Sequence, residues 1–155
     1  MTTAYIDADA CPVTREAISI ARSRGISVVL VSNGTQNLAK YLGRAGVEAI
    51  QVSGGQDAAD FAIIEVLAPG DVVVTQDIGL AAMVLGRGAY ALSPRGRTFS
   101  MATIDAELAV RHAEQKHRRA GGRTGGPSAM DEDDRDRFRF AFERAISEAT
   151  RASGA

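Results

Sequence analysis

The stretch YIDADACPV, residues 5–13, ends an apolar segment with two carboxylates one residue apart, and a cysteine and a proline follow at once. Residues 3–7 have the composition of a short strand. Pro12 suits the first position of a helix, because the missing N–H of proline would have no partner there. Apolar residues then recur at helical spacing until Gly25. The stretch therefore predicts a strand followed directly by a helix.

Strand–helix alternation continues over about the first 90 residues. It predicts a three-layer α/β/α fold with a mostly parallel sheet of about five strands, because crossover helices lie on both faces of such a sheet. In sheets of this kind, ligands bind at the carboxyl ends of the strands. The expected strands are residues 3–7, 26–32, 47–52, 72–75 and 89–92. The expected helices begin at Pro12 and cover 57–68 and 77–88, and residues 33–46 are expected to form a turn and a short, weak helix.

The chain of 155 residues suits one compact domain with one core. Residues 1–112 are expected to form the α/β domain, with a further helix within 98–112. Residues 113–130 are basic and then rich in glycine, which indicates a flexible linker. Residues 131–150 have apolar side chains on one helical face, so we expect an amphipathic C-terminal helix that packs on the same domain.

The net charge is −1, but the charges are unevenly placed. Residues 95–123 carry seven bases and three acids, whereas the segments on either side carry more acids than bases. Such a basic segment either binds an anionic partner or folds back onto the acids of its own chain.

Location and assembly are only partly predictable from the chain. No apolar run approaches the roughly 20 residues that span a bilayer, and the N-terminus lacks the pattern of a secretory signal. The single cysteine excludes an internal disulfide and fits a reducing compartment. We therefore expect a cytoplasmic protein without a membrane segment; an oligomer is possible, but the sequence does not specify one.

Aspartates follow three of the expected strands. Asp7 and Asp9 follow the first strand, Asp57 and Asp60 begin the helix after the third, and Asp77 begins the helix after the fourth. Because parallel strands end at one edge of the sheet, the loops can bring these side chains together. Gathered carboxylates repel one another unless a cation neutralises them, and Mg²⁺ or Mn²⁺ prefers oxygen ligands. We therefore predict that all five bind a divalent metal and that Asp7, Asp9 and Asp77 are catalytic.

Helix capping is the alternative for three of these acids. Asp57 and Asp77 stand where N-cap residues are expected, and Asp60 lies in a first turn, where the helix dipole favours a negative charge. Asp7 and Asp9 are harder to explain by structure alone, because two acids on one face of a strand repel each other without a partner.

Other polar side chains stand at the same edge. Ser32 and Asn33 end the second strand, and Thr75 ends the fourth. They would hold a phosphate, a metal-bound water or one of the carboxylates, although Asn-Gly is also a plain turn signal. Arg95 and Arg97 follow the fifth strand and would either clamp a phosphate or pair with the chain's own acids.

Cys11 lies beside an expected helix N-terminus, a position that can lower the pKa of a thiol. A phosphatase loop of the Cys-x5-Arg type is absent, because Ala17 occupies the position of the arginine. We interpret Cys11 as a small packed side chain.

The motifs YIDADACPV, VVLVSNG, GGQDAADFAI, DVVVTQDIGLA, LSPRGR and GGP…DRDRF, in this order over about residues 5–140, resemble the YaiI/YqxD family of uncharacterised bacterial proteins. The resemblance implies similarity in fold to PIN-like domains, many of which are Mg²⁺- or Mn²⁺-dependent ribonucleases with acids at one edge of the sheet. It implies that Asp7, with Asp9 beside it, is the first acid of that cluster. The other aspartates named above would complete the cluster, with Ser32 and Asn33 as polar support.

Three functions fit these observations. The first is a divalent-metal-dependent nuclease acting on RNA, in which a metal-activated water attacks a phosphodiester while Arg95, Arg97 and the basic residues of 111–123 contact the backbone. The second is a phosphatase of the haloacid-dehalogenase type, with Asp7 as the nucleophile and Asp9 as the acid. The third is a non-catalytic nucleic-acid-binding or regulatory module with a vestigial metal site.

Two observations weigh against the alternatives to a nuclease. The phosphatase type needs a lysine just ahead of the acid after the fourth strand, but the chain's lysines are Lys40 and Lys116, and a cap domain is also absent. The slightly negative net charge argues against strong nonspecific binding to nucleic acid, although it does not exclude a local basic patch.

Overall fold

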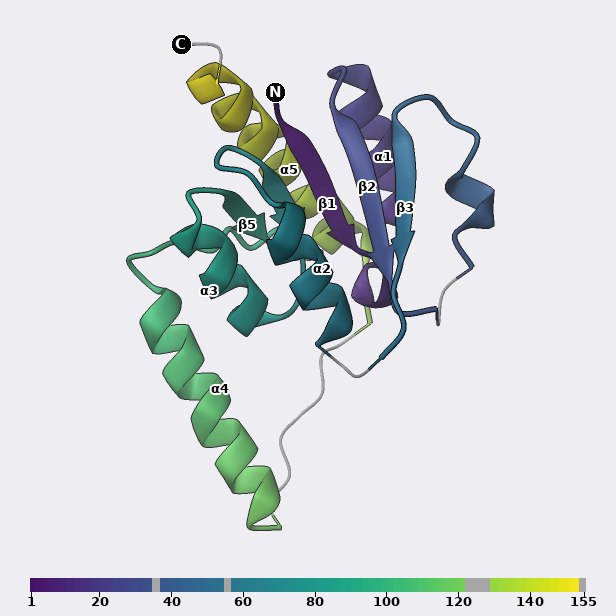
Figure 1. Ribbon diagram of the computed structural model, residues 1–155. Helices are drawn as coiled ribbons and strands as arrows, with labels where there is room; N and C mark the ends of the chain where they lie inside the picture. Colours follow the sequence, from purple (N-terminus) through teal and green to yellow (C-terminus); the bar gives the residue numbers. More distant parts are fainter. Residues whose placement is uncertain (35–36, 55–56, 122–128, 154–155) are drawn as a thin grey trace.

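The computed structural model describes residues 1–34, 37–54, 57–121 and 129–153. In this part of the chain, five strands form one parallel sheet in the order β3-β2-β1-β4-β5 (Figure 1). The prediction of an α/β fold with a parallel sheet of about five strands is therefore confirmed. The strands are β1 (Thr3–Asp7), β2 (Ser27–Ser32), β3 (Val47–Gln51), β4 (Val72–Val74) and β5 (Tyr90–Leu92).

Helices cover both faces of the sheet (Figure 1). α1 and α5 lie on one face, while α2, α3 and the first turn of α4 lie on the other. The connections β1–β2, β3–β4 and β4–β5 thus place α1, α2 and α3 where each can bury an apolar face. The helices are α1 (Thr14–Ser23), α2 (Ala58–Val66), α3 (Ile78–Gly86), α4 (Ile104–Arg119) and α5 (Glu132–Ser153), with 3-10 turns η1 (Ala8–Ala10) and η2 (Ala39–Tyr41).

The hydrophobic core lies in two layers, one on each side of the sheet. On the α1 and α5 side, the rings of Phe138 and Phe142 stack with their centroids 5.3 Å apart against buried side chains such as Ile6 and Leu30. On the other side, strand residues such as Val73 pack against α2 and α3. Strands β1 and β4 lie inside the sheet and are buried on both faces, which explains their nearly continuous apolar sequences.

The segment between β2 and β3 departs from the expectation. The short helix expected within 33–46 is reduced to the single turn η2. Gly34, Gly43 and Gly46 have positive φ angles, which are incompatible with a continuous right-handed helix.

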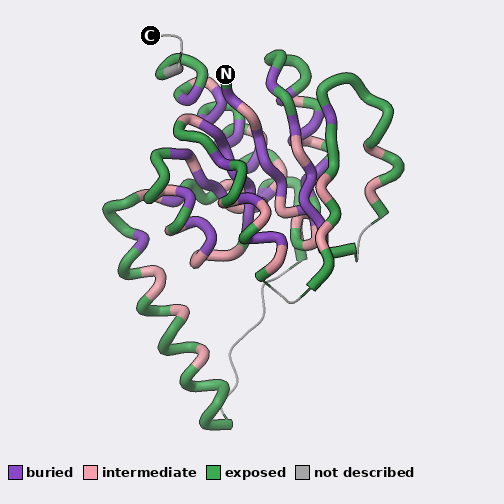
Figure 2. Tube along the Cα trace, in the orientation of Figure 1, coloured by how far each residue is buried: buried purple, intermediate pink, exposed green. Residues whose placement is uncertain are grey.

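Helix α4 projects away from the rest of the molecule (Figure 1). Ile104 in its first turn is buried, whereas most of the helix is exposed, and Val110 is 58% accessible (Figure 2). The helix includes residues 113–119, the first part of the segment whose composition indicated a linker; residues 122–128 lie outside the described part of the chain. Among the described helices, none combines the length and the apolar character that crossing a membrane requires.

Candidate functional site

The order of the strands places β1 beside β4 at the point where the topology reverses. From β1 the chain adds β2 and β3 on one side, then returns to add β4 and β5 on the other. In parallel sheets a crevice forms at such a switch point, at the carboxyl ends of the strands. Asp7, the last residue of β1, and Thr75, directly after β4, meet there. Thr75 Oγ1 donates a hydrogen bond to Asp7 Oδ2 at 3.0 Å.

Asp9 lies in the turn η1 and is held by the end of β2. Ser32 Oγ donates to Asp9 Oδ1, and the backbone N–H of Asn33 donates to Asp9 Oδ2, both at 2.8 Å. The N–H of Gly34 in turn donates to Ser32 Oγ at 3.1 Å. The side chain of Ser32 thus holds a carboxylate, one of the roles considered for it, whereas Asn33 holds the same carboxylate through its backbone.

Asp77 both caps a helix and faces the crevice. Its Oδ1 accepts hydrogen bonds from the N–H groups of Gly79 at 2.8 Å and Leu80 at 3.2 Å, which is the N-cap interaction for α3. The same oxygen is 3.2 Å from Arg111 Nη1 of α4. Asp57 also occupies an N-cap position, that of α2, but among the described residues its side chain makes no capping hydrogen bond. Helix capping therefore explains the position of Asp77, but it does not explain that of Asp57.

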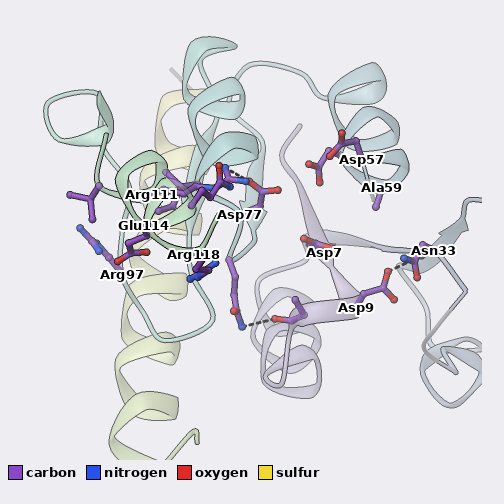
Figure 3. Close-up of a pocket in the computed structure, with 16 residues that line it drawn as sticks. Asp7, Asp9, Asn33, Asp57, Ala59, Asp77, Arg97, Arg111, Glu114 and Arg118 are labelled. Carbon is purple, nitrogen blue, oxygen red and sulfur yellow. Dashed lines mark hydrogen bonds and ion pairs between the residues drawn. The ribbon is translucent and has the colours of Figure 1, made fainter. Parts of the chain in front are cut away.

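A pocket of about 910 Å³ joins these residues. It is lined by all five predicted aspartates and by Asn33, and its other wall carries Arg97 together with side chains of α4 (Figure 3). In Figure 3, Asp9 and Asn33 lie on one side, and Asp77 with Arg111, Glu114 and Arg118 on the other. The pocket thus has a carboxylate-rich side and an arginine-bearing side. The aspartates that line it are Asp7, Asp9, Asp57, Asp60 and Asp77.

The aspartates disturb one another's ionisation. The pKa of Asp60 is raised to about 7. The largest cause is burial, followed by the charge of Asp77 and a hydrogen bond with it, and then by the charges of Asp7 and Asp57. Burial also raises the pKa of Asp7, and the charges of Asp9 and Asp77 add to this rise, while the hydrogen bond from Thr75 opposes it. Full ionisation of the cluster is therefore unfavourable, and a bound cation would relieve the repulsion.

The donor set suits a hydrated divalent cation. Within the described residues, no group of three or more His, Cys, Asp or Glu side chains is arranged to hold a metal ion. Mg²⁺, however, commonly keeps several waters and uses one or two carboxylates together with substrate phosphates. The guanidinium of Arg111 on Asp77 shows that this carboxylate already attracts a cation. One or two of the pocket aspartates would hold such an ion, and water would complete its coordination.

The two arginines after β5 take different positions. Arg97 lines the pocket and forms an ion pair with Glu107 of α4. Arg95 lies outside the pocket lining and donates to Asp134 Oδ2 of α5 at 2.9 Å. Gly96, between them, adopts a positive φ of 87° in a turn, so the two side chains leave the backbone in different directions. The internal salt bridge was the alternative for both arginines, and both form one, Arg95 with Asp134 and Arg97 with Glu107.

The polar pocket residues Gln76, Arg111, Glu114 and Arg118 were not singled out one by one from the sequence, although the two arginines lie within its basic segment 111–123. Gln76 follows Thr75 and donates through Nε2 to the carbonyl of Ala10 at 2.9 Å. The other three, Arg111, Glu114 and Arg118, come from α4. Their spacing of three, four and seven residues is that of one helical face, and this is the signal that could have identified them.

Cys11 has the environment of a packed side chain. Burial raises the pKa of its thiol to about 11, against hydrogen bonds that lower it. The thiolate is therefore a minor species at neutral pH, and a reactive nucleophile at this position is disfavoured.

The sequence profile of a family described as "Uncharacterized BCR, YaiI/YqxD family" matches residues 5–148, a range that includes every pocket residue described above. The chain belongs to the YaiI/YqxD family. This membership confirms the resemblance seen in the motifs.

Relatives of this YaiI/YqxD protein carry the name UPF0178 protein and come from bacteria. The one from Exiguobacterium sibiricum is 44% identical over 146 residues, which cover 94% of this chain and 97% of the relative. One from Xanthomonas campestris is 48% identical over 145 residues, 92% of this chain and 89% of the relative. One from Rhodopseudomonas palustris is 40% identical over 152 residues, 98% and 96% of the two chains. No solved structure matches the chain.

The family motifs occupy two places in this YaiI/YqxD protein. Four of them contribute the pocket aspartates and the residues that hold them. The remaining two, LSPRGR and the DRDRF segment, meet in the ion pair between Arg95 and Asp134. The last two motifs therefore join the end of β5 to α5, and LSPRGR also brings Arg97 into the pocket lining.

Proposed function

We propose that this YaiI/YqxD protein is a divalent-metal-dependent nuclease that hydrolyses phosphodiester bonds of RNA in the pocket at the carboxyl edge of the sheet. The observation that carries the proposal is the lining of that one pocket. Five aspartates face it from the ends of β1 and the starts of α2 and α3, and Arg97 and Arg111 line it too. RNA is the substrate implied by similarity to PIN-like domains, which is an argument from fold.

Phosphodiester hydrolysis needs a group that activates water and groups that bind the phosphate, and the carboxylates and the arginines of the pocket match these two needs. Bound Mg²⁺ or Mn²⁺ would neutralise phosphate charge and activate water. Asp7, Asp9 and Asp77 are the proposed catalytic acids, and Ser32, Asn33 and Thr75 hold two of them in place. Arginine guanidinium groups bind phosphate oxygens through paired N–H donors.

The proposed reaction balances with water as the only co-reactant. The oxygen of water forms a bond to phosphorus, and the bond from phosphorus to one ester oxygen breaks. A carboxylate of the pocket accepts a proton from the water and releases it to solvent, and the departing ester oxygen takes a proton from solvent and leaves as an alcohol. The location proposed for this activity is the cytoplasm, as the single cysteine suggests.

The test compares cleavage of end-labelled single-stranded RNA, with Mn²⁺ or with EDTA, by the wild type and by a protein carrying both Asp7→Asn and Asp9→Asn. We expect cleavage by the wild type that EDTA abolishes, and at least about a hundredfold slower cleavage by the double variant. Asp105→Asn is the matched control, because this exposed acid of α4 lies outside the pocket lining.

The outcomes separate the three functions considered. Equal cleavage by the wild type and the double variant would contradict the proposal. Release of inorganic phosphate from an aryl phosphate, without cleavage of RNA, would support the phosphatase instead. Mn²⁺ binding without either reaction would support a non-catalytic module. Circular dichroism of each variant verifies that the substitutions leave the fold intact.

A further inference from the structure

Two arginines of α4 face the pocket from one side of the helix. Arg111 and Arg118 both line it, together with Glu114 between them (Figure 3). Seven residues of α-helix place their Cα atoms about 10.5 Å apart along the helix axis. Most of α4 projects from the body of the protein (Figure 1). The two arginines therefore extend the pocket lining along the helix.

The inner arginine rests on a carboxylate of the proposed metal site. Arg111 Nη1 lies 3.2 Å from Asp77 Oδ1, and the two side chains are 40% and 31% accessible. An ion pair as accessible as this one contributes little to stability and exchanges partners readily. The contact therefore neutralises Asp77 without fixing Arg111 in place.

Gly79 makes room for this contact. A Cβ atom at Gly79 would lie 2.9 Å from Arg111 Nη1 and 3.1 Å from Asp77 Oδ1. A larger residue at this position would crowd both the guanidinium and the carboxylate oxygen. The first turn of α3 thus leaves a space that the Arg111 side chain fills.

A divalent cation and the Arg111 guanidinium compete for Asp77. Both are positive, so a cation bound among the carboxylates repels the guanidinium and takes over the neutralising role. The displaced guanidinium stays on a flexible side chain at the wall of the pocket. A phosphate group of a ligand bound to the cation would then lie in the same pocket and could pair with the guanidinium.

We propose that Arg111 is an exchangeable cation: it pairs with Asp77 when the pocket holds no divalent metal, and it binds a backbone phosphate when the metal is present. Arg118 binds a second phosphate farther along α4. The ligand is therefore a nucleic-acid strand with several phosphates rather than a mononucleotide. This inference rests on the proposed function, because it takes a nucleic-acid backbone as the ligand of the same pocket.

The first experiment measures Mn²⁺ affinity by calorimetry without nucleic acid. Arg111→Gln removes the competing cation, so we expect Mn²⁺ to bind about twofold to fivefold more tightly, the range that corresponds to an exposed ion pair. Lys116→Gln is the matched control, because it removes one positive charge from α4 outside the pocket lining, and we expect it to leave the affinity unchanged.

The second experiment measures binding of labelled phosphorothioate oligonucleotides, RNA and DNA in separate arms, by anisotropy at several salt concentrations with Mn²⁺. Arg111→Gln and Arg118→Gln should each reduce the slope of log affinity against log salt by about 0.7, the value for one phosphate contact on a single strand. Lys116→Gln should leave the slope unchanged. A labelled mononucleotide should bind far more weakly than either oligonucleotide.

Distinct results overturn the inference and the proposed function. Unchanged Mn²⁺ affinity in Arg111→Gln overturns the exchange at Asp77, even if the wild type cleaves RNA. Salt slopes equal to that of the wild type in both arginine variants overturn the phosphate contacts. A wild type that binds no Mn²⁺ overturns the proposed function, and the inference with it.

Discussion

The hydroxyl of Thr75 connects two of the pocket aspartates. Its Oγ1 donates to Asp7 Oδ2 and accepts a hydrogen bond from the backbone N–H of Asp77, both at 3.0 Å. Thr75 is 1% accessible. The bridge crosses the point where the strand order reverses, and it opposes the rise in the pKa of Asp7 that burial causes. It therefore favours the ionised carboxylate that cation binding requires.

Replacing Thr75 with valine should destabilise the protein and raise the pKa of Asp7. Valine has nearly the same shape but neither donates to Asp7 nor accepts from Asp77, so a loss of about 1–3 kcal/mol in the free energy of unfolding is expected. Chemical denaturation measures the loss, and NMR titration of the Asp7 carboxyl carbon measures the pKa. Thr75→Ser retains the hydroxyl and is the control. A valine variant as stable as the serine variant would show that the bridge is unimportant.

Asp60 should make the metal-free protein less stable as the pH rises toward neutrality. Its folded-state pKa of about 7 lies above the value of about 4.0 for an unfolded aspartate. Between these values the folded state holds the proton that the unfolded state has lost, so raising the pH favours unfolding. Asp60→Asn has no charge to place in the cluster. In EDTA it should therefore melt higher than the wild type above about pH 7, and this advantage should shrink toward about pH 4.

The control for Asp60→Asn is Asp105→Asn, which removes an exposed acid outside the pocket lining. It should shift the melting temperature little and without this pH dependence. If the difference between Asp60→Asn and the wild type were the same at both ends of the pH range, repulsion among the carboxylates would not be its cause.

Local sequence patterns were sufficient to predict the sheet and the acidic edge. Apolar runs bounded by glycine and proline indicated the strands, and parallel connections place all strand ends together. This is why Asp7, Asp60 and Asp77 could be assigned to one pocket without knowledge of the strand order. The hydrogen bond between Asp7 and Thr75, by contrast, depends on β1 lying beside β4, which adjacent segments of sequence do not encode.

The contacts of the arginines could not be predicted from the sequence. Arg95 and Arg97 are two residues apart, yet one pairs with α5 and the other lines the pocket, because the turn at Gly96 separates them. The contact of Arg111 with Asp77 depends on the angle at which α4 leaves the body. A mostly exposed helix has no long apolar stripe from which that angle could be predicted. The sequence therefore showed that α4 is basic, but not that Arg111 contacts Asp77.

Replacing Gly96 with alanine should destabilise the junction between β5 and α5. The residue has a φ of 87°, and a Cβ there would overlap the backbone of Arg137. The positive φ and the overlap together predict a loss of about 2–4 kcal/mol in the free energy of unfolding, measured by denaturant titration. Gly43→Ala is the matched control, since Gly43 has a similar φ of 91° with open space around it. Equal losses in the two variants would mean that the close approach to α5 carries no cost.

Asp134 should stabilise the same junction in a pH-dependent way. A hydrogen bond from the backbone N–H of Asp131 and the guanidinium groups of Arg137 and Arg95 hold the pKa of its carboxyl below the usual value, against a smaller opposing effect of desolvation. A folded-state pKa below the unfolded value gives stability that is fully present above the unfolded pKa of about 4.0 and is lost as the pH falls through the folded pKa.

The variant Asp134→Asn should therefore melt below the wild type at neutral pH, and the two melting curves should converge in acid. Differential scanning calorimetry at neutral pH and below about pH 4 measures this convergence. Asp133→Asn removes a neighbouring, exposed acid from the same first turn of α5 and is the control for charge near the helix N-terminus. A gap for Asp134→Asn that persists unchanged in acid would assign the loss to packing, because the contacts of the ionised carboxylate with Arg95 and Arg137 weaken once it is protonated.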